Sequence, residues 1–169
     1  MCIRDSLEYL IDCAKISQSN STIHFIIAGK GSELAKIKAL ATQFKLTNIS
    51  FVGFLTKKSI KELLNSTDAI YISFTDKPIM ETNSPNKFFD GLAAGKLCIT
   101  NTKGWIKELI EENKCGFYYN PAQPEEFGTL ILPYIQKREL LKEAQQNARS
   151  LAENKFSKTI ITEDFIKMF

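Results

Sequence analysis

A lysine and an aspartate lie three residues apart in the segment that runs from Asn83 to Gly95, NSPNKFFDGLAAG. If this segment is a helix, Lys87 and Asp90 share one face. A cation in the first turn opposes the helix dipole, unless an anion such as a phosphate binds at the same end. Asp90 could then accept hydrogen bonds from sugar hydroxyls. A surface Lys–Asp pair, worth about a few tenths of a kcal/mol, explains the two residues equally well.

The ends of this helix are marked in the sequence. Asn83 or Ser84 can be the N-cap, Pro85 suits the first helical position, and Gly95 suits the C-terminal cap. The apolar residues at helical spacing would face the interior: Phe88, Phe89 and Leu92. A short helix that follows a strand is therefore the expected carrier of the lysine and the aspartate.

Apolar periodicity along the chain alternates between strands and helices. Near-continuous apolar runs predict buried strands at about 23–28, 49–52, 69–74, 97–100 and 116–119. Helical spacing predicts helices at about 6–18, 34–44, 60–64, 83–95, 104–113, 123–136 and 138–154, followed by a terminal amphipathic helix. Thr56 or Ser59 can cap the third of these helices.

Five strands that alternate with helices predict a doubly wound, Rossmann-like α/β domain, with one parallel sheet and helices on both faces. Ligands of such sheets bind at the carboxyl ends of the strands. This rule singles out the loops at 29–32, 53–56 and 75–86.

Two glycine turns lie at this edge. Gly29-Lys-Gly31-Ser lets the backbone approach a nucleotide, or it is only a tight turn with Ser32 as the helix cap. The third glycine of the dinucleotide fingerprint is missing. Gly53 ends the next strand and either exposes backbone groups to a flat base or is an ordinary strand end.

Composition excludes several other classes of protein. The chain has 169 residues, of which 44% are hydrophobic and 24% charged, and its scattered lysines give a net charge of only +3, without the basic block of a nucleic-acid-binding protein. No apolar run approaches the roughly 18 residues of a membrane span, and no apolar run of a signal peptide follows the first residues.

The cysteines and the histidine do not suggest metal or nucleophile chemistry. The four cysteines (Cys2, Cys13, Cys98 and Cys115) are far apart and there is one histidine, so we expect reduced thiols, a cytoplasmic protein and no metal site. His24 lies at the amino end of a strand and has a structural role, so no Ser-His-Asp or Cys-His arrangement can be built. Trp105 is expected to pack.

Several segments in this order resemble the C-terminal, donor-binding half of retaining GT-B glycosyltransferases of group 1 (family 4): FIIAGKGSE, ISFVGFL, DAIYISF, NSPNKFFDGLAAGKLCIT and KCGFYYNP. The resemblance covers residues 7–155, and its specific part is 83–100. That part also resembles transferases of bacterial surface-polysaccharide assembly, including those for N-acetylated amino sugars. The implied substrates are a nucleotide diphosphate sugar, with a UDP-sugar favoured, and a glycan or lipid-linked acceptor.

The resemblance implies two acidic residues at the donor site. Asp90 takes the place of the acid that contacts the ribose. The acid that contacts the donor sugar is expected eight residues earlier, where Thr82 stands. Either Glu81, one residue away, serves with a shifted loop, or this branch of the family lacks the acid.

The remaining site residues also come from the resemblance. Those expected to face the donor sugar and diphosphate are Asn83, Ser84, Asn86 and Lys87. Those expected to border the base are Gly29, Gly31, Gly53, Phe54 and Leu55. No cofactor or metal is implied, and no nucleic-acid partner.

The resemblance divides the chain into three parts. Residues 1–6 do not match the family, whose C-terminal half begins with a strand and a loop that supply an Arg and a Lys to the diphosphate. Residues 7–155 are expected to form the donor domain. Residues 156–169 are expected to form a helix that packs toward the N-terminal half of a full enzyme. We therefore expect an N-terminally truncated gene and an isolated chain without transfer activity. The full enzyme is expected to work in the cytoplasm. Whether it also associates peripherally with the inner face of the membrane stays open.

Two other functions stay open. A nucleotide-binding or regulatory α/β module without catalysis would share these features. A fragment of a GT-B-type sugar-nucleotide epimerase would need further carboxylates and a histidine in the cleft, and His24 is in the wrong place for that role.

Overall fold

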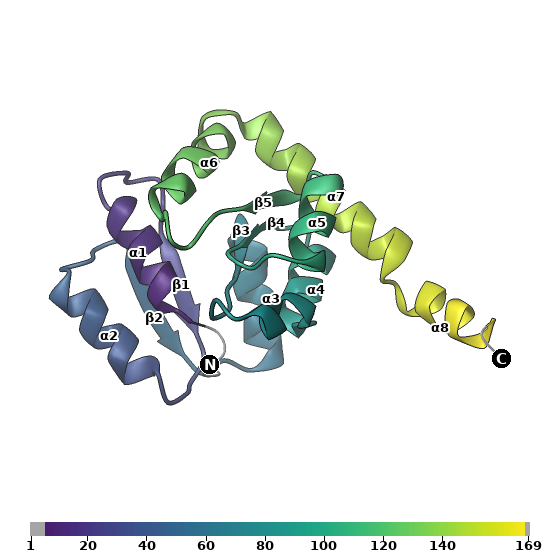
Figure 1. Ribbon diagram of the computed structural model, residues 1–169, viewed down its shortest axis with the longest axis horizontal. Helices are drawn as coiled ribbons and strands as arrows, with labels where there is room; N and C mark the ends of the chain where they lie inside the picture. Colours follow the sequence, from purple (N-terminus) through teal and green to yellow (C-terminus); the bar gives the residue numbers. More distant parts are fainter. Residues whose placement is uncertain (1–5, 168–169) are drawn as a thin grey trace.

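The computed structural model describes residues 6–167, in which strands and helices alternate (Figure 1). In chain order the elements are α1 (Glu8–Ile16), β1 (Phe25–Ala28), α2 (Leu34–Gln43), β2 (Ile49–Gly53), α3 (Lys57–Ser66), β3 (Ala69–Ile72), the 3-10 helix η2 (Pro78–Thr82), α4 (Asn86–Ala93), β4 (Leu97–Thr100), α5 (Trp105–Glu112), β5 (Gly116–Tyr118), α6 (Glu125–Gln136), α7 (Arg138–Lys155) and α8 (Lys158–Ile166). The five predicted strands are all present, and the predicted α/β class is confirmed.

The strands pair in parallel, as predicted, but they form two sheets instead of one. β1 pairs with β2, while β3, β4 and β5 form a separate sheet in that order. Within residues 6–167 no backbone ladder joins β1 to β3, so the prediction of one continuous sheet was wrong for this part of the chain. Side chains join the two halves where backbone hydrogen bonds do not: Phe25 and Tyr71 pack against the cores of both.

The half built from β3, β4 and β5 is covered by helices on both faces. All four residues of β4 are buried. Cys98 packs in the core formed with α4, α5 and α7, whereas its neighbours Leu97 and Ile99 pack in the core formed with α6. This alternation is the two-residue period of a strand, and burial on both faces explains why the whole strand is apolar or small.

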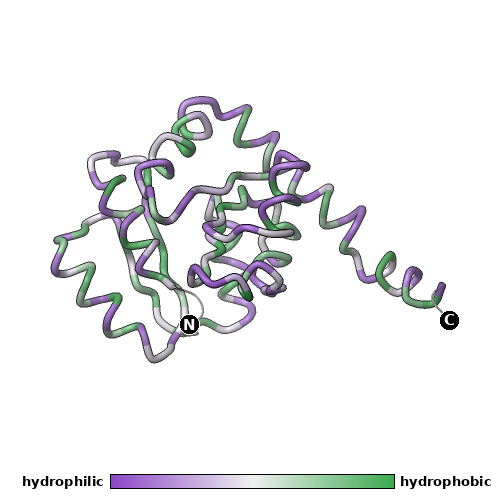
Figure 2. The backbone as a smooth tube through the Cα atoms, viewed as in Figure 1, coloured by the Kyte–Doolittle hydropathy of each residue, from purple (hydrophilic) through white to green (hydrophobic). Residues whose placement is uncertain are grey.

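Among residues 6–167, helices cover the half built from β1 and β2 on one face only. Ile27 packs against Ile11 of α1 and Ile37 of α2. Ile26 and Val52 are 39% and 43% exposed. In Figure 2 the strands are largely apolar in both halves. Hydropathy alone therefore does not show which face of a strand is covered by helices and which is exposed.

Two helix ends follow their sequence signals. The Thr56 side chain accepts a hydrogen bond from the Ser59 N–H at 3.2 Å, so Thr56 is the cap of α3. Gly95 has a φ of +61° after α4, and the N–H groups of Gly95 and Lys96 donate to the carbonyls of Leu92 and Gly91. This is the Schellman arrangement that favours glycine.

Two predicted caps were wrong. α4 begins at Asn86, with Pro85 as N-cap and no side-chain cap, because the Asn83 side chain turns back to accept from the Ser84 N–H at 2.9 Å. Ser84 precedes a proline, which favours extended backbone and delays the helix. The N-cap of α2 is Glu33 and not Ser32.

The C-terminal helices extend from the domain. Figure 1 shows α7 along the β3–β5 half and α8 projecting beyond it. The large apolar side chains of Ile161, Phe165 and Ile166 are more than half exposed on α8, at 52%, 60% and 65%. Among the described residues, no helix combines the length and the hydropathy that crossing a membrane requires.

Three of the four cysteines lie in the described part, and all three are buried, free thiols: Cys13, Cys98 and Cys115. Burial raises the pKa of Cys13 to about 12, so this thiol is unreactive at neutral pH. The prediction of reduced thiols holds for these three residues, and Cys2 lies outside the described residues.

Candidate active site

A polar pocket lies at the carboxyl ends of β3, β4 and β5. Its lining residues come from the loops that follow these strands: Thr75, Asp76, Lys77, Glu81, Asn101, Thr102, Lys103, Tyr118, Asn120 and Pro121. Carboxylate, ammonium, amide and hydroxyl groups thus meet at one edge of the sheet. Such a set suits a ligand that carries both anionic groups and hydroxyls.

Glu81 reaches this pocket from η2 (Pro78–Thr82), the short helix between β3 and α4. Thr82, the position where the resemblance places an acid, is exposed, and its hydroxyl donates to the Ile79 carbonyl at 3.0 Å. Of the two adjacent residues, only Glu81 is in the pocket lining.

Tyr118 brings a hydrogen-bond donor to the lining of the pocket, at the end of β5 (Gly116–Tyr118). Burial, together with the carboxylates of Glu126 and Asp76, raises the pKa of the Tyr118 hydroxyl. Lys107 lies 4.8 Å from the centre of the Tyr118 ring. The hydroxyl therefore stays protonated at neutral pH and can donate to a ligand oxygen.

The start of α4 brings a cation to the end of β3. Lys87 directs its Nζ toward the Ser73 carbonyl at 3.5 Å and lies 5.3 Å from the centre of the Phe74 ring. The N–H groups of the first turn of a helix have no partner within the helix and attract anions. Asn86 and Lys87 occupy this first turn, and Asp90 follows one turn later, exposed and outside the pocket lining.

The two glycine turns meet at the ends of β1 and β2. The Gly29 N–H donates to the Gly53 carbonyl at 2.6 Å, and both glycines have positive φ angles, +132° and +71°. Lys30 lies 4.9 Å from the centre of the Phe54 ring, which is 68% exposed. The turns thus present an aromatic surface and a cation side by side.

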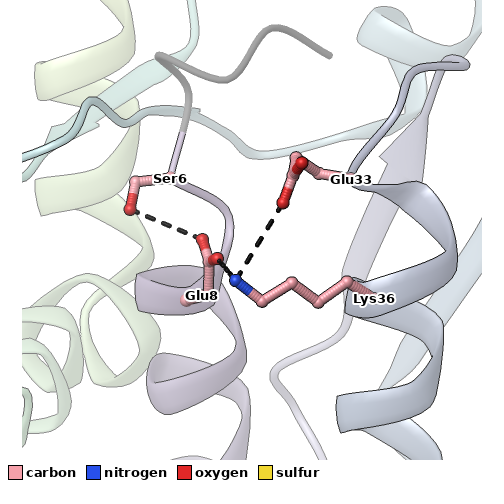
Figure 3. A network of polar contacts seen from close by, with 4 residues as sticks. All are labelled: Ser6, Glu8, Glu33 and Lys36. Carbon is pink, nitrogen blue, oxygen red and sulfur yellow. Dashed lines mark hydrogen bonds and ion pairs between the residues drawn. The ribbon is translucent and has the colours of Figure 1, made fainter.

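A network of partly exposed ion pairs links α1 to α2, the helix that follows the first glycine turn. In Figure 3, Lys36 of α2 points toward Glu8 of α1, with its Nζ 2.6 Å from Glu8 Oε1 and 4.0 Å from Glu33 Oε2, while Ser6 donates to the other oxygen of Glu8 at 3.5 Å. Partial burial acts to raise the pKa of Glu8, but the hydrogen bonds from Lys36, Ser6 and the Glu8 backbone, together with the positive charge of Lys36, outweigh it, so the pKa lies below its ordinary value.

The structure brings the predicted residues together in two groups. One lies around η2 and α4: Glu81, Asn83, Ser84, Asn86, Lys87 and Asp90. The other lies at the ends of β1 and β2: Gly29, Gly31, Gly53, Phe54 and Leu55. His24 precedes β1 at its amino end, where its Nε2 is 2.8 Å from Ser50 Oγ, and it takes no part in either group.

Sequence reasoning missed the loops after β4 and β5. Asn101, Lys103 and Tyr118 line the pocket, although only the loops after the first three strands were expected to do so. The rule that ligands bind at the carboxyl ends of strands applies to every strand of the sheet. Applied to all five, it would have included them. Within residues 6–167, no cluster of His, Cys, Asp and Glu suits a metal ion.

Comparison with known proteins decides the family. The model of the family "Glycosyl transferases group 1" matches residues 4–151. The chain belongs to the group 1 glycosyl transferases. Spore coat protein SA of Bacillus subtilis (strain 168) is 27% identical over 127 residues, which are 72% of this chain and 32% of that protein. The group 1 chain thus spans about a third of the length of this curated relative.

Solved structures share the fold of this group 1 domain. Alr3699/HepE of Anabaena, solved in complex with UDP-glucose, is 19% identical, with a TM-score of 0.81 over 99% of this chain and 46% of that chain. The C-terminal domain of LpcC, a group 1 family protein of Francisella tularensis, is 16% identical, with a TM-score of 0.77 over 94% of this chain and 83% of that chain.

Proposed function

We propose that this group 1 domain is the donor-binding half of a retaining glycosyltransferase. The full enzyme moves a sugar from a nucleotide diphosphate sugar, with a UDP-sugar favoured, to a glycan or lipid-linked acceptor in surface-polysaccharide synthesis. The observation that carries the proposal is the polar pocket at the ends of β3–β5, with Glu81 in its lining and the first turn of α4 next in the chain. The UDP-glucose complex of Alr3699/HepE, which shares the fold, supports the choice of UDP.

The proposed chemistry is electrostatic. In sugar transfer the bond from the sugar to the diphosphate breaks, and negative charge develops on the departing phosphate. The N–H groups at the start of α4 and the Lys87 ammonium stabilise this charge. Asp90 accepts hydrogen bonds from the ribose, and Glu81 accepts them from hydroxyls of the sugar.

The base is proposed to bind at the ends of β1 and β2. Phe54 offers an exposed ring, and the turns around Gly29, Gly31 and Gly53 let backbone groups approach a flat ring. Leu55 is half-buried beside Phe54 and would border the same ligand. In this proposal one ligand spans both groups of residues, with its base at the turns that follow β1 and β2 and its sugar and diphosphate at η2 and α4.

The division of the sheet suggests how the full enzyme is organised. β2 pairs with one edge of β1, and β4 pairs with one edge of β3. The resemblance places a strand ahead of α1, and we propose that this strand lies between the remaining edges of β1 and β3, because strands that follow one another in the chain commonly lie side by side. Residues 7–155 then form the donor domain, and α8 packs its exposed apolar side chains toward an acceptor-binding half.

Titration of the chain with UDP-, GDP- and ADP-sugars tests this function. Isothermal calorimetry should detect binding of a UDP-sugar, and Asp90→Ala should weaken it about tenfold or more, because a hydrogen bond to a carboxylate is worth about 1.5–3 kcal/mol. Glu62→Gln on exposed α3 is the matched control and should bind like the unmodified chain. Equal binding by the Asp90 variant would remove Asp90 from the site, and no binding of any nucleotide sugar would overturn the proposal.

A further inference from the structure

The segment that carries Glu81 is held at three points by residues that follow β4. This segment runs from Phe74 to Asn83 and joins β3 to α4. It contains η2, whose ends are closed by hydrogen bonds from Met80 N–H to the Lys77 carbonyl at 2.8 Å and from Asn83 N–H to the Met80 carbonyl at 3.2 Å. Neither the family match nor the sequence signals assign these residues a role in holding Glu81.

Asn101 holds the start of the segment. Its side-chain amide accepts a hydrogen bond from the Phe74 N–H at 2.9 Å and donates one to the Phe74 carbonyl at 3.0 Å. Asn101 is only 5% exposed. The side chain thus continues the ladder between β3 and β4 for one more residue and fixes the direction in which the chain leaves the sheet.

Gly104 holds the middle of the segment by allowing direct backbone contact. It has φ +77° and ψ −158°, a conformation that is essentially restricted to glycine. A Cβ at this position would lie 2.6 Å from the Glu81 carbonyl oxygen and 2.9 Å from the Glu81 Cβ. Any side chain at position 104 would therefore push Glu81 away from its place in the pocket.

Trp105 holds the end of the segment. Its indole N–H donates to the Asn83 carbonyl at 3.1 Å. The indole ring stacks on Phe89 with a centroid distance of 6.2 Å and meets Phe88 edge-on at 5.8 Å. Because both phenylalanines belong to α4, Trp105 fixes the segment relative to the helix that begins two residues after Ser84.

We propose that Asn101, Gly104 and Trp105 are positioning residues that hold Glu81 toward the sugar of the bound donor. This inference rests on the proposed function, and it names the residues on which recognition of the sugar depends. The three residues hold backbone or side chains of the segment and none of them needs to touch the sugar. Loosening them should therefore weaken the binding of a UDP-sugar more than the binding of UDP.

Calorimetry of the 169-residue chain tests this difference. The probes are UDP and whichever of UDP-glucose, UDP-galactose and UDP-N-acetylglucosamine binds most tightly. Gly104→Ala should weaken UDP-sugar binding relative to UDP about tenfold, and Trp105→Phe, which keeps a stacked ring but loses the N–H donor, about fivefold. An unchanged ratio of the two affinities in both variants would overturn the inference.

Gly95→Ala is the matched control for glycine strain. Gly95 also has a positive φ, +61°, but a Cβ there would meet the Gln145 carbonyl at 3.3 Å, at the far end of α4. This variant should lose folding stability and keep the ratio of UDP-sugar to UDP affinity. A changed ratio in this variant would show that general destabilisation produces the effect, and it would overturn the assignment.

Hydrogen exchange tests the positioning role without a ligand. The amides of 77–83 should exchange faster in Gly104→Ala and Trp105→Phe than in the unmodified chain and in Gly95→Ala. Unchanged exchange would overturn the inference even if the chain binds a donor. If the unmodified chain binds no nucleotide sugar, the proposed function fails, and faster exchange of these amides still upholds the positioning of Glu81.

Discussion

The two halves of the sheet offer the same kind of strand but differ in what covers it. β4 is buried on both faces, between the core of α4, α5 and α7 and the core of α6. β1 and β2 bury one face against α1 and α2 and leave Ile26 and Val52 partly exposed on the other. We infer that the β3–β5 half, where the polar pocket lies, contributes most of the folding stability. The β1–β2 half contributes the aromatic turn at Phe54, on a sheet with one exposed face.

A matched pair of isoleucines gives the largest expected difference. Ile72 of β3 is fully buried and Ile26 of β1 is 39% exposed. Ile72→Ala should lower the free energy of unfolding by about 2–5 kcal/mol, because it removes buried methyl groups and leaves a cavity. Ile26→Ala should cost about 1 kcal/mol. Urea unfolding followed by circular dichroism measures both, and equal losses would contradict the contrast between the halves.

Glu81→Gln should give the next largest effect, on binding alone. If Glu81 accepts hydrogen bonds from the sugar, loss of its charge should weaken UDP-sugar binding about tenfold and leave UDP binding unchanged. Calorimetry with both ligands separates the two contributions. Glu62→Gln serves as the control, and equal weakening of UDP and UDP-sugar binding in the Glu81 variant would place the residue elsewhere along the ligand.

Phe54→Ala should produce the opposite pattern with a smaller effect. The ring is 68% exposed, so its loss should leave the melting temperature unchanged. If the base stacks on this ring, UDP and UDP-sugar should both bind about two- to tenfold more weakly. A loss confined to the UDP-sugar would show that the β1–β2 half does not hold the base.

The ion pair between α1 and α2 should give the smallest effect, and it depends on pH. The pKa of Glu8 is lower in the folded chain than its ordinary value, so its contribution to stability is present above that value and disappears as the pH falls through the folded pKa. Glu8→Gln should therefore lower the melting temperature slightly at pH 7 and not at all in strong acid. Salt at 1 M should remove most of the difference at pH 7, and a difference that persists in acid would contradict this explanation.

Much of this fold could be predicted because local patterns agree with burial. The apolar runs predict the strands β1 to β5, and the residues Thr56 and Gly95 predict helix ends. Each of these predictions depends only on residues close together in the chain. The division of the sheet could not be predicted, because β1 and β3 have the same apolar character whether or not a strand pairs between them. The exposure of Ile26 and Val52 has the same origin: a strand pattern does not show which helices reach its faces.

The candidate site was predicted in part for a similar reason. Glycine turns and the polar start of α4 are visible as short motifs, and in the structure each follows the carboxyl end of a strand, where ligands of parallel sheets bind. Asn101, Gly104 and Trp105 carry no such motif, since their importance comes from contacts with Phe74, Glu81 and Asn83, more than 20 residues away in the chain. Contacts over that distance become visible only in the fold.

The most direct test of the central claim is to map the donor site by nuclear magnetic resonance. The chain, at 19.1 kDa, suits titration of its amide signals with a UDP-sugar. The largest shifts should fall in 75–90 and 101–104, with a second group at 29–31 and 53–55 that UDP alone also produces. The absence of shifts at millimolar UDP-sugar, or shifts confined to α6, α7 and α8, would contradict the proposal that these two loop groups bind a nucleotide sugar.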